Sequence, residues 1–303
     1  MKFGSILATC GHLALLLVMQ NATAGERPNG VIGNTLCLNA DPSDAMGTYG
    51  TIEKALGTGS IEAPSDNVSE PRRPHIISLP NDALLGPYFS FIANEPNDVN
   101  LDLVPMSKGG DRSRTEIKLS ANSGGSHDIF KAHEGDTFVY TWRFRISPNM
   151  KFSPSFTHLH QIKAHGGNFA APPLITLTPL SSGQLEIRYV GDGKADSATY
   201  TKIKSVALAG LLGQWLDVRE EITFSNSIGR YRLNVTGQQG QKIVDFDQPG
   251  LELWREGASH MTPKWGIYRR HHAALNQNQD DSVDFANFGI TRGAHPDSNC
   301  RQE

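Results

Sequence analysis

Hydrophobic and polar residues alternate in short runs along most of this chain, from His75 onward. The clearest run is 137–146, where apolar side chains occupy the even positions and Thr141, Arg143 and Arg145 occupy odd ones. Alternation with a period of two is typical of a half-buried β-strand. The same pattern predicts further strands at 88–93, 114–119, 156–164, 174–178, 185–189, 199–206, 215–224, 230–235 and 282–291.

These strands, separated by polar turns and with no long amphipathic helix between them, indicate an all-β protein. We predict a single β-jelly-roll sandwich of two antiparallel sheets over residues 73–303. Residues 25–72 are rich in Gly, Asn, Ser, Asp and Pro and have little periodicity. They predict an irregular N-terminal arm with one short helix at 49–56. At 303 residues the chain can form one sizeable core.

Residues 1–24 have the pattern of a secretory signal peptide. Lys2 precedes an apolar run at 6–18, and Ala22, Thr23 and Ala24 form a small-residue cleavage site. The apolar run is too short to span a bilayer. No later segment is longer or more apolar, so we expect a secreted protein, extracellular or periplasmic, that is not embedded in a membrane.

Export would leave two cysteines, Cys37 and Cys300, because Cys10 lies in the signal. In an oxidising compartment two such residues are expected to form a disulfide. Without Lys2 there are 27 Lys and Arg residues against 31 Asp and Glu, a net charge of −4. A chain of this charge is not a general binder of polyanions, so a nucleic-acid partner is not expected.

Residues 263–272 contain the most informative polar pattern. If they form a strand, Trp265 and Ile267 share the core face. The opposite face then holds Lys264, Gly266, Tyr268 and Arg270. A glycine between an ammonium and a phenol would leave room for a ligand against the backbone. The alternative is an ordinary edge strand with a solvated cationic side.

Two more strands have unusual polar faces. In 112–118 one face holds Arg112, Arg114, Glu116 and Lys118, which could also be an ordinary solvated sheet surface. In 156–163 Gln161 and Lys163 share one face, whereas His158 and His160 share the other with apolar residues. A histidine in such a position is usually a satisfied core residue, but strand twist or a bulge could turn His158 toward a cleft.

Together these stretches resemble the jelly-roll polysaccharide lyases, a group that includes alginate lyases, glucuronan lyases and type I heparinase. The matching motifs are Arg114-Thr115-Glu116, Gln161-Ile162-Lys163 and Lys264-Trp265-Gly266-Ile267-Tyr268, in the family's order. Alginate lyases typically have histidine where this chain has Lys163. The resemblance therefore leaves the catalytic base open between Lys163, His158 and Tyr268.

The resemblance implies β-elimination on a uronic acid polymer. Arg114 and Gln161 would neutralise the sugar carboxylate and the enolate-like intermediate, and Tyr268 would act as acid, or as acid and base, if nearby cations favour its ionised form. Glu116 would orient Arg114. The residues expected to contact the substrate are Arg112, Glu116, Lys118, Lys264, Arg270 and His272.

Two other functions would make different demands on the sequence. A retaining glucanase would need closely paired acids, but no Glu-x-Asp-x-x-Glu run occurs, and Glu220 and Glu221 point to opposite faces of their strand. A non-catalytic, lectin-like carbohydrate-binding protein could use the same cations, with Trp265 or Trp254 as an aromatic platform.

The partner implied by these residues is an acidic polysaccharide, and the protein is expected to be a monomer. The lyase reaction requires no cofactor and no metal is expected in the site. A structural calcium ion could bind near Asp280, Asp281 and Asp284, although acids in such a loop are more often simply solvated.

Overall fold

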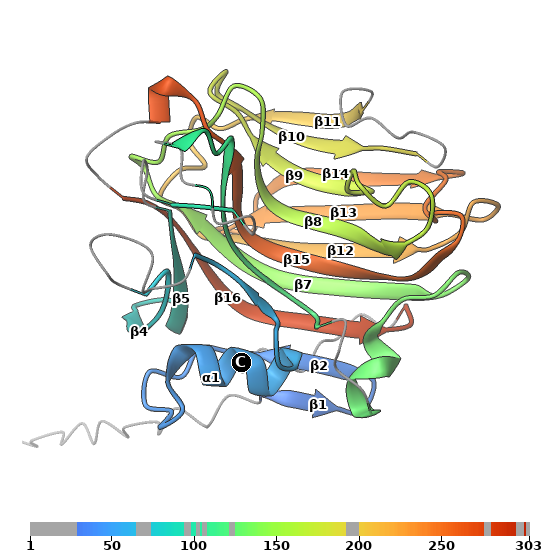
Figure 1. Ribbon diagram of the computed structural model, residues 1–303, viewed down its shortest axis with the longest axis horizontal. Helices are drawn as coiled ribbons and strands as arrows, with labels where there is room; N and C mark the ends of the chain where they lie inside the picture. Colours follow the sequence, from blue (N-terminus) through green and yellow to red (C-terminus); the bar gives the residue numbers. More distant parts are fainter. Residues whose placement is uncertain are drawn as a thin grey trace, which may run out of the picture.

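Two antiparallel β-sheets pack face to face and form the body of the protein (Figure 1). The computed structural model describes residues 29–64, 74–93, 98–100, 104, 108–120, 125–191, 200–275, 280–294 and 300. Within them the sheets have nine and seven strands. This is the all-β jelly-roll sandwich that the alternation of apolar and polar positions predicted.

The nine-stranded sheet has the order β1-β2-β16-β7-β12-β13-β14, with β5 paired to β16 and β4 paired to β5. Its strands are β1 (Gly30–Ile32), β2 (Thr35–Leu38), β4 (Ile76–Asp82), β5 (Gly86–Ala93), β7 (Thr137–Ile146), β12 (Leu216–Thr223), β13 (Arg230–Gly237), β14 (Lys242–Pro249) and β16 (Asp281–Arg292).

The seven-stranded sheet has the order β11-β10-β9-β8-β15-β6-β3. Its strands are β3 (Ile61–Glu62), β6 (Arg112–Lys118), β8 (Thr157–Gly166), β9 (Ile175–Pro179), β10 (Gln184–Tyr189), β11 (Thr201–Ala207) and β15 (Ala258–Arg270). The helices described are α1 (Gly47–Leu56) and the short 3₁₀ helices η2 (Gly125–Phe130) and η4 (Ala273–Leu275). None of the described helices is long and apolar enough to cross a membrane.

The core forms between the inner faces of the two sheets. Trp265 and Ile267 of β15 are fully buried, as their alternation predicted. The Trp265 ring lies 5.9 Å from that of Trp142 on β7 and 5.1 Å from that of Phe288 on β16, measured between ring centres. Aromatic contacts across the sandwich therefore fix which face of β15 is turned away from the core.

A buried polar group also joins the sheets. The side chain of His160, on β8, lies 2.9 Å from a carboxylate oxygen of Glu220 on β12, and its other ring nitrogen donates to the carbonyl of Lys264. Tyr231 donates a hydrogen bond of 2.8 Å to the second oxygen of Glu220. His160 is thus a satisfied core residue, as expected from its apolar neighbours.

The N-terminal segment is more regular than predicted. Strand β2 pairs with β16 and strand β3 with β6, so this arm adds an edge strand to one sheet and two strands to the other. The expectation of an irregular arm is wrong for these strands, which are too short to show periodicity. The predicted helix at 49–56 is present as α1. The predicted signal peptide, residues 1–24, lies outside the described residues.

Cys37 and Cys300 form a disulfide, as predicted from their number and the inferred export. Both residues are fully buried, and the bridge links positions separated by 263 residues. Closing so long a loop reduces the entropy of the unfolded chain.

We expect the double variant Cys37→Ala/Cys300→Ala to lose about 2–5 kcal/mol of unfolding free energy relative to the oxidised protein. Urea unfolding followed by tryptophan fluorescence measures the difference. Reductant should lower the midpoint of the wild-type protein but leave that of the variant unchanged. Equal midpoints for the two oxidised proteins would show that the bridge does not stabilise the fold.

Candidate active site

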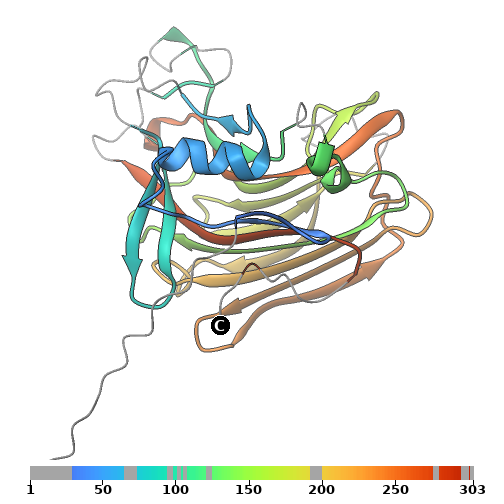
Figure 2. The same ribbon diagram turned by 90° about the horizontal axis from the view of Figure 1, so that it is seen from below.

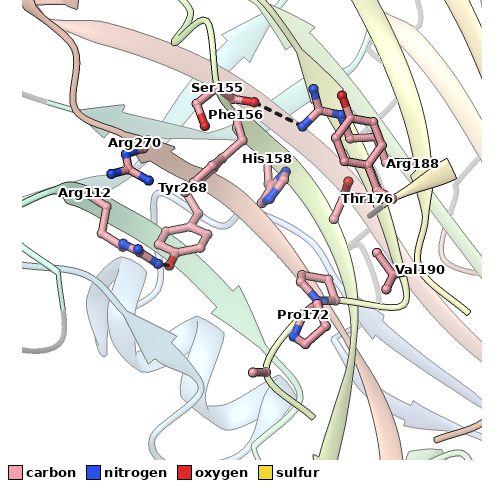
Figure 3. Close-up of a pocket in the computed structure, with 13 residues that line it drawn as sticks. Arg112, Ser155, Phe156, His158, Pro172, Thr176, Arg188, Val190, Tyr268 and Arg270 are labelled. Atoms are coloured by element: carbon pink, nitrogen blue, oxygen red, sulfur yellow. Dashed lines mark hydrogen bonds between the residues drawn. The ribbon is translucent and has the colours of Figure 1, made fainter. Parts of the chain in front are cut away.

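Tyr268 lies on β15, between β6 and β8, on the face of the seven-stranded sheet that is turned away from the core (Figure 3). It is in register with Arg114 on β6 and His158 on β8. Arg112 donates a hydrogen bond of 2.7 Å from Nη1 to the phenolic oxygen, and the guanidinium carbon of Arg114 lies 3.9 Å from the ring centre. The phenolic oxygen of Tyr268 thus lies at the pocket next to two guanidinium groups, a position suited to proton transfer.

His158 and His160 lie on opposite faces of β8, although strict alternation would place them on the same face. His160 is in the core and bonded to Glu220, whereas the ring of His158 lies 6.0 Å from that of Tyr268. The pairing of β8 with β15 is irregular here, because Trp265 pairs with His160 and Tyr268 with His158, so that β15 holds the extra residue. The sequence named strand twist or a bulge as the condition for His158 to face the cleft, and the strands depart from regular pairing at this point.

His158 is a neutral imidazole at ordinary pH. Burial and then the positive charges of Arg188 and Arg114 lower its pKa to about 3. Its Nδ1 lies 2.8 Å from the hydroxyl oxygen of Thr178, which fixes the ring orientation. A base is most effective when its pKa is close to the working pH, so His158 is better suited to hydrogen bonding than to removing a proton.

Three cations and two carboxylates form a cluster next to Tyr268. Arg114 donates to Glu62 at 2.7 Å and to Glu116 at 3.1 Å. Lys264 donates to Glu62 at 2.5 Å, and Lys118 bonds to the other oxygen of the same carboxylate. Burial alone would raise the pKa of Glu62, but Lys264, Lys118 and Arg114 lower it to about 2. Glu62 is therefore ionised and holds these three cations together.

The amide of Gln161 belongs to the same cluster. Its Nε2 donates to Glu116, which is fully buried and whose pKa is raised chiefly by that burial. Arg114, Gln161 and Tyr268 are thus connected through direct contacts on one face of the sheet. However, the amide nitrogen of Gln161 is bonded to Glu116 rather than directed at the space beside Tyr268.

A pocket of about 520 Å³ opens beside Tyr268 (Figure 3). Its volume is within the range of roughly 300–1,000 Å³ that is common for ligand sites. It is lined by Arg112, Ser155, Phe156, His158, Ala171, Pro172, Pro173, Thr176, Arg188, Val190, Tyr200, Tyr268 and Arg270. Three of these residues are arginines and none is an aspartate or glutamate. Asp111 pairs with Arg112 and lies 3.9 Å from Arg270, and Glu186 pairs with Arg188, so three guanidinium groups face two carboxylates and an excess of positive charge remains for an anionic ligand.

The structure does not bring Lys163 to Tyr268. Lys163 pairs with Thr262, six residues from Tyr268 along β15, and its ammonium donates to the carbonyls of Ala170 and Ala171. Burial, followed by the charges of Lys264 and Arg114, lowers its pKa to about 8. Because Ala171 lines the pocket, Lys163 supports the pocket wall, and its position argues against the role of base.

The other predicted contact residues are distributed unevenly. Arg112 and Arg270 line the pocket, whereas Glu116, Lys118 and Lys264 belong to the buried cluster. His272 is exposed beyond the end of β15 and does not line the pocket.

Several residues of this site were not predicted. Arg188, Phe156, Tyr200 and Thr176 line the pocket, and Glu62 organises the cluster. The alternation of Glu186 and Arg188 within an apolar strand was a usable signal for Arg188. Glu62 had no such signal, because its strand β3 has only two residues.

Trp265 and Trp254 are not exposed aromatic platforms, and Gly266 does not leave space for a ligand. Trp265 is fully buried and Trp254 is 7% exposed, so neither can serve as an exposed platform for a sugar. Gly266 has a φ of +142°, and an added Cβ would lie 2.1 Å from the carbonyl oxygen of Thr115. The neighbouring strand β6, rather than space for a ligand, therefore accounts for glycine at this position.

No cluster of metal-ligating side chains occurs among the described residues. Of the acids considered for calcium, Asp281 accepts a hydrogen bond of 2.5 Å from Arg269, and Asp284 is paired with Arg145 at 2.8 Å. A calcium requirement stays a prediction.

Three histidines make stability depend on pH. Burial is the main cause that lowers the pKa of His158 to about 3 and those of His165 and His260 to about 4, from 6.5. The unfolded chain therefore binds protons below pH 6.5 that the folded chain does not bind until the pH approaches 4. Stability is complete above pH 6.5 and falls as the pH drops from 6.5 to 4.

For His158 the expected slope is about 1.4 kcal/mol per pH unit, and the other two, being more exposed, add less. Urea midpoints measured across this pH range test the effect. His165→Gln, which cannot be protonated, should reduce the slope, with His271→Gln as a control outside this group. Urea midpoints that do not change between pH 6.5 and 4 would show that these histidines do not have lowered pKa values in the folded protein.

Known proteins that are similar to this chain agree with the resemblance that its motifs suggest. A family model described as polysaccharide lyase matches residues 91–287, whereas no curated protein matches the chain. Among solved structures, the alginate lyase from Aplysia kurodai is 12% identical with a TM-score of 0.53, covering 85% of this chain and 98% of that one. Alginate lyase Aly36B is 13% identical with a TM-score of 0.50, covering 86% and 98%.

The endo-β-1,4-glucuronan lyase from the fungus Trichoderma reesei is also similar. It is 13% identical with a TM-score of 0.47, covering 77% of this chain and 94% of that one. The first two similarities show a shared sandwich fold.

Proposed function

This chain belongs to the polysaccharide lyase family, and we propose that it cleaves a uronic-acid-containing polysaccharide by β-elimination. The product would be an unsaturated uronide at the new non-reducing end. The observation that supports this best is the pocket beside Tyr268, which three arginines and no carboxylate line. A polymer with a carboxylate on its sugars has the charge that this lining favours.

The main barrier to the reaction is the weak acidity of the carbon next to the sugar carboxylate. An ionised carboxylate opposes the second negative charge that forms when the proton leaves. Arg270 lines the pocket near Tyr268 and can neutralise that carboxylate with a planar, multiply donating group. Arg112 also lines the pocket, but its Nε and Nη2 donate to Asp111 and its Nη1 to Tyr268, so it contributes positive charge beside the phenol. Arg114, whose guanidinium is stacked on the Tyr268 ring, adds a further positive charge next to the phenol.

Tyr268 is the proposed base and acid. Its phenolate, stabilised by the hydrogen bond from Arg112, removes the proton from the carbon beside the carboxylate. The electron pair forms a double bond to the next ring carbon, and the glycosidic oxygen leaves. The same phenol then returns the proton to that oxygen. Neutral His158, 6.0 Å from the Tyr268 ring, would hydrogen-bond the sugar rather than remove its proton.

Export forms part of the proposal. Residues 1–24 have the pattern of a signal peptide, and the disulfide between Cys37 and Cys300 is typical of an oxidising compartment. A polysaccharide substrate also lies outside the cell membrane in most settings, so secretion would bring enzyme and polymer together.

A panel of alginate, glucuronan, pectate, hyaluronan and heparin-type polymers tests the function. Cleavage by elimination creates a conjugated double bond, so ultraviolet absorbance should rise with at least one polymer. New reducing ends without any rise in absorbance would indicate hydrolysis and contradict the proposal. The polymer cleaved fastest would identify the uronic acid.

A further inference from the structure

Arg188 lies at the far end of the pocket from Tyr268 (Figure 3). It is on β10, which β9 and β8 separate from the strand of Tyr268, β15. With neighbouring strands about 4.8 Å apart, the backbones of β10 and β15 are roughly 14 Å apart. Tyr268 and Arg188 therefore line different parts of the pocket, and a ligand that fills it can contact both.

The guanidinium of Arg188 is held firmly in place. Its Nε donates to Glu186 at 2.8 Å and its Nη1 donates to the carbonyl of Ser155 at 3.1 Å. The ring of Tyr200 covers it, with 4.0 Å between the guanidinium carbon and the ring centre. The side chain is only 8% exposed, so most of its freedom has already been lost before a ligand binds.

The remaining nitrogen, Nη2, has no hydrogen-bond partner among the described residues. The local charge also remains positive, because the single carboxylate of Glu186 is shared between Arg188 and Lys202. Burial alone would raise the pKa of Glu186, but its hydrogen bonds from Arg188 and Lys202 lower it, so this carboxylate is ionised. One acid with two cations leaves an excess positive charge at the pocket wall.

We propose that Arg188 binds the carboxylate of a second uronic acid in the same polymer chain, on a sugar other than the one that loses its proton at Tyr268. This inference rests on the proposed function and extends it. The enzyme would then bind the carboxylates of two sugars across the seven-stranded sheet. Arg188 would make it specific for polymers with closely spaced carboxylates.

The test is a binding measurement that does not depend on turnover. Calorimetry would compare Tyr268→Phe with Tyr268→Phe/Arg188→Gln, using uronate oligosaccharides from the disaccharide to the hexasaccharide. We expect the loss of Arg188 to weaken binding of the longer oligosaccharides by about 10- to 100-fold, as for a charged hydrogen bond. For the disaccharide, which cannot span the pocket, the two proteins should bind equally.

Two controls make the result specific. Lys204→Gln, in the same Tyr268→Phe background, removes an exposed cation of strand β11 that neither pairs with Glu186 nor lines the pocket, so binding should change less than threefold. Hexasaccharides whose carboxylates have been reduced to alcohols should bind equally with and without Arg188.

The inference fails if Arg188→Gln weakens every oligosaccharide by the same factor, which would indicate a structural effect, or if it weakens none. Failure of the proposed function has a different signature, because wild-type protein would then yield no unsaturated product from any uronate polymer. A length-dependent loss of binding would support the role of Arg188 in either case.

Discussion

Tyr268→Phe is expected to lower turnover by about 10²- to 10⁴-fold, the range for removal of a general acid or base. The change deletes the oxygen that accepts a hydrogen bond from Arg112 but keeps the ring beside Arg114. Substrate affinity should therefore stay within a few-fold of wild type. Initial rates by absorbance and binding by calorimetry separate the two effects.

Tyr88→Phe is the matched control for this experiment. Tyr88 lies on β5 of the other sheet and also has a guanidinium near its ring, that of Arg145 at 5.2 Å, but it does not line the pocket. Its loss of the hydroxyl should leave turnover unchanged. Near-normal turnover by Tyr268→Phe would show that another group transfers the proton.

Arg114→Ala is the second large effect, with an expected loss of about 10²- to 10³-fold in turnover. The substitution removes the positive charge 3.9 Å from the Tyr268 ring centre. It also leaves the carboxylates of Glu62 and Glu116 without their shared cation, so the field at Tyr268 becomes more negative. The negative charge that develops on the sugar during proton removal is then less well stabilised, and the reaction slows.

Lys118→Gln controls for disruption of the ion cluster itself. Lys118 bonds to Glu62 as Arg114 does, but it pairs with Lys264, four residues from Tyr268 along β15. We expect a clearly smaller loss of turnover from Lys118→Gln than from Arg114→Ala. Equal losses, together with equal falls in melting temperature, would mean that Arg114 acts only by stabilising the fold.

The parts of this molecule that could be predicted from sequence are those governed by strand periodicity. The alternation in 263–272 predicts that Trp265 and Ile267 lie in the core and that Tyr268 lies on the opposite face. All three residues are found on the predicted faces. The run at 137–146 corresponds to β7 without any shift of its ends. Period-two patterning predicts such features because each residue's face follows from its neighbours.

The site residues that escaped prediction depend on contacts between distant segments. Glu62, from a two-residue strand, reaches Arg114 and Lys264, which lie 52 and 202 positions away. Lys163 was a candidate base because of its place in a motif, yet its ammonium is bonded to the carbonyls of Ala170 and Ala171. No local pattern in the chain encodes these partners.

The orientation of His158 is intermediate between these cases. Strict alternation would place His158 with His160 in the core, yet His158 lines the pocket, next to an irregular pairing of β8 with β15. Sequence reasoning could name a bulge as the condition for His158 to reach the cleft, but could not locate it. The irregularity depends on pairing with a strand that is distant in the chain, which local periodicity does not report.

The most direct test of a lyase centred on Tyr268 is the fate of the cleaved bond in water labelled with heavy oxygen. Mass spectrometry should show uronate fragments with new non-reducing ends that are lighter, by one water molecule, than the fragments that hydrolysis would produce. The cleavage step itself should introduce no label. Saturated fragments that acquire heavy oxygen at the cleaved bond would show hydrolysis and contradict β-elimination.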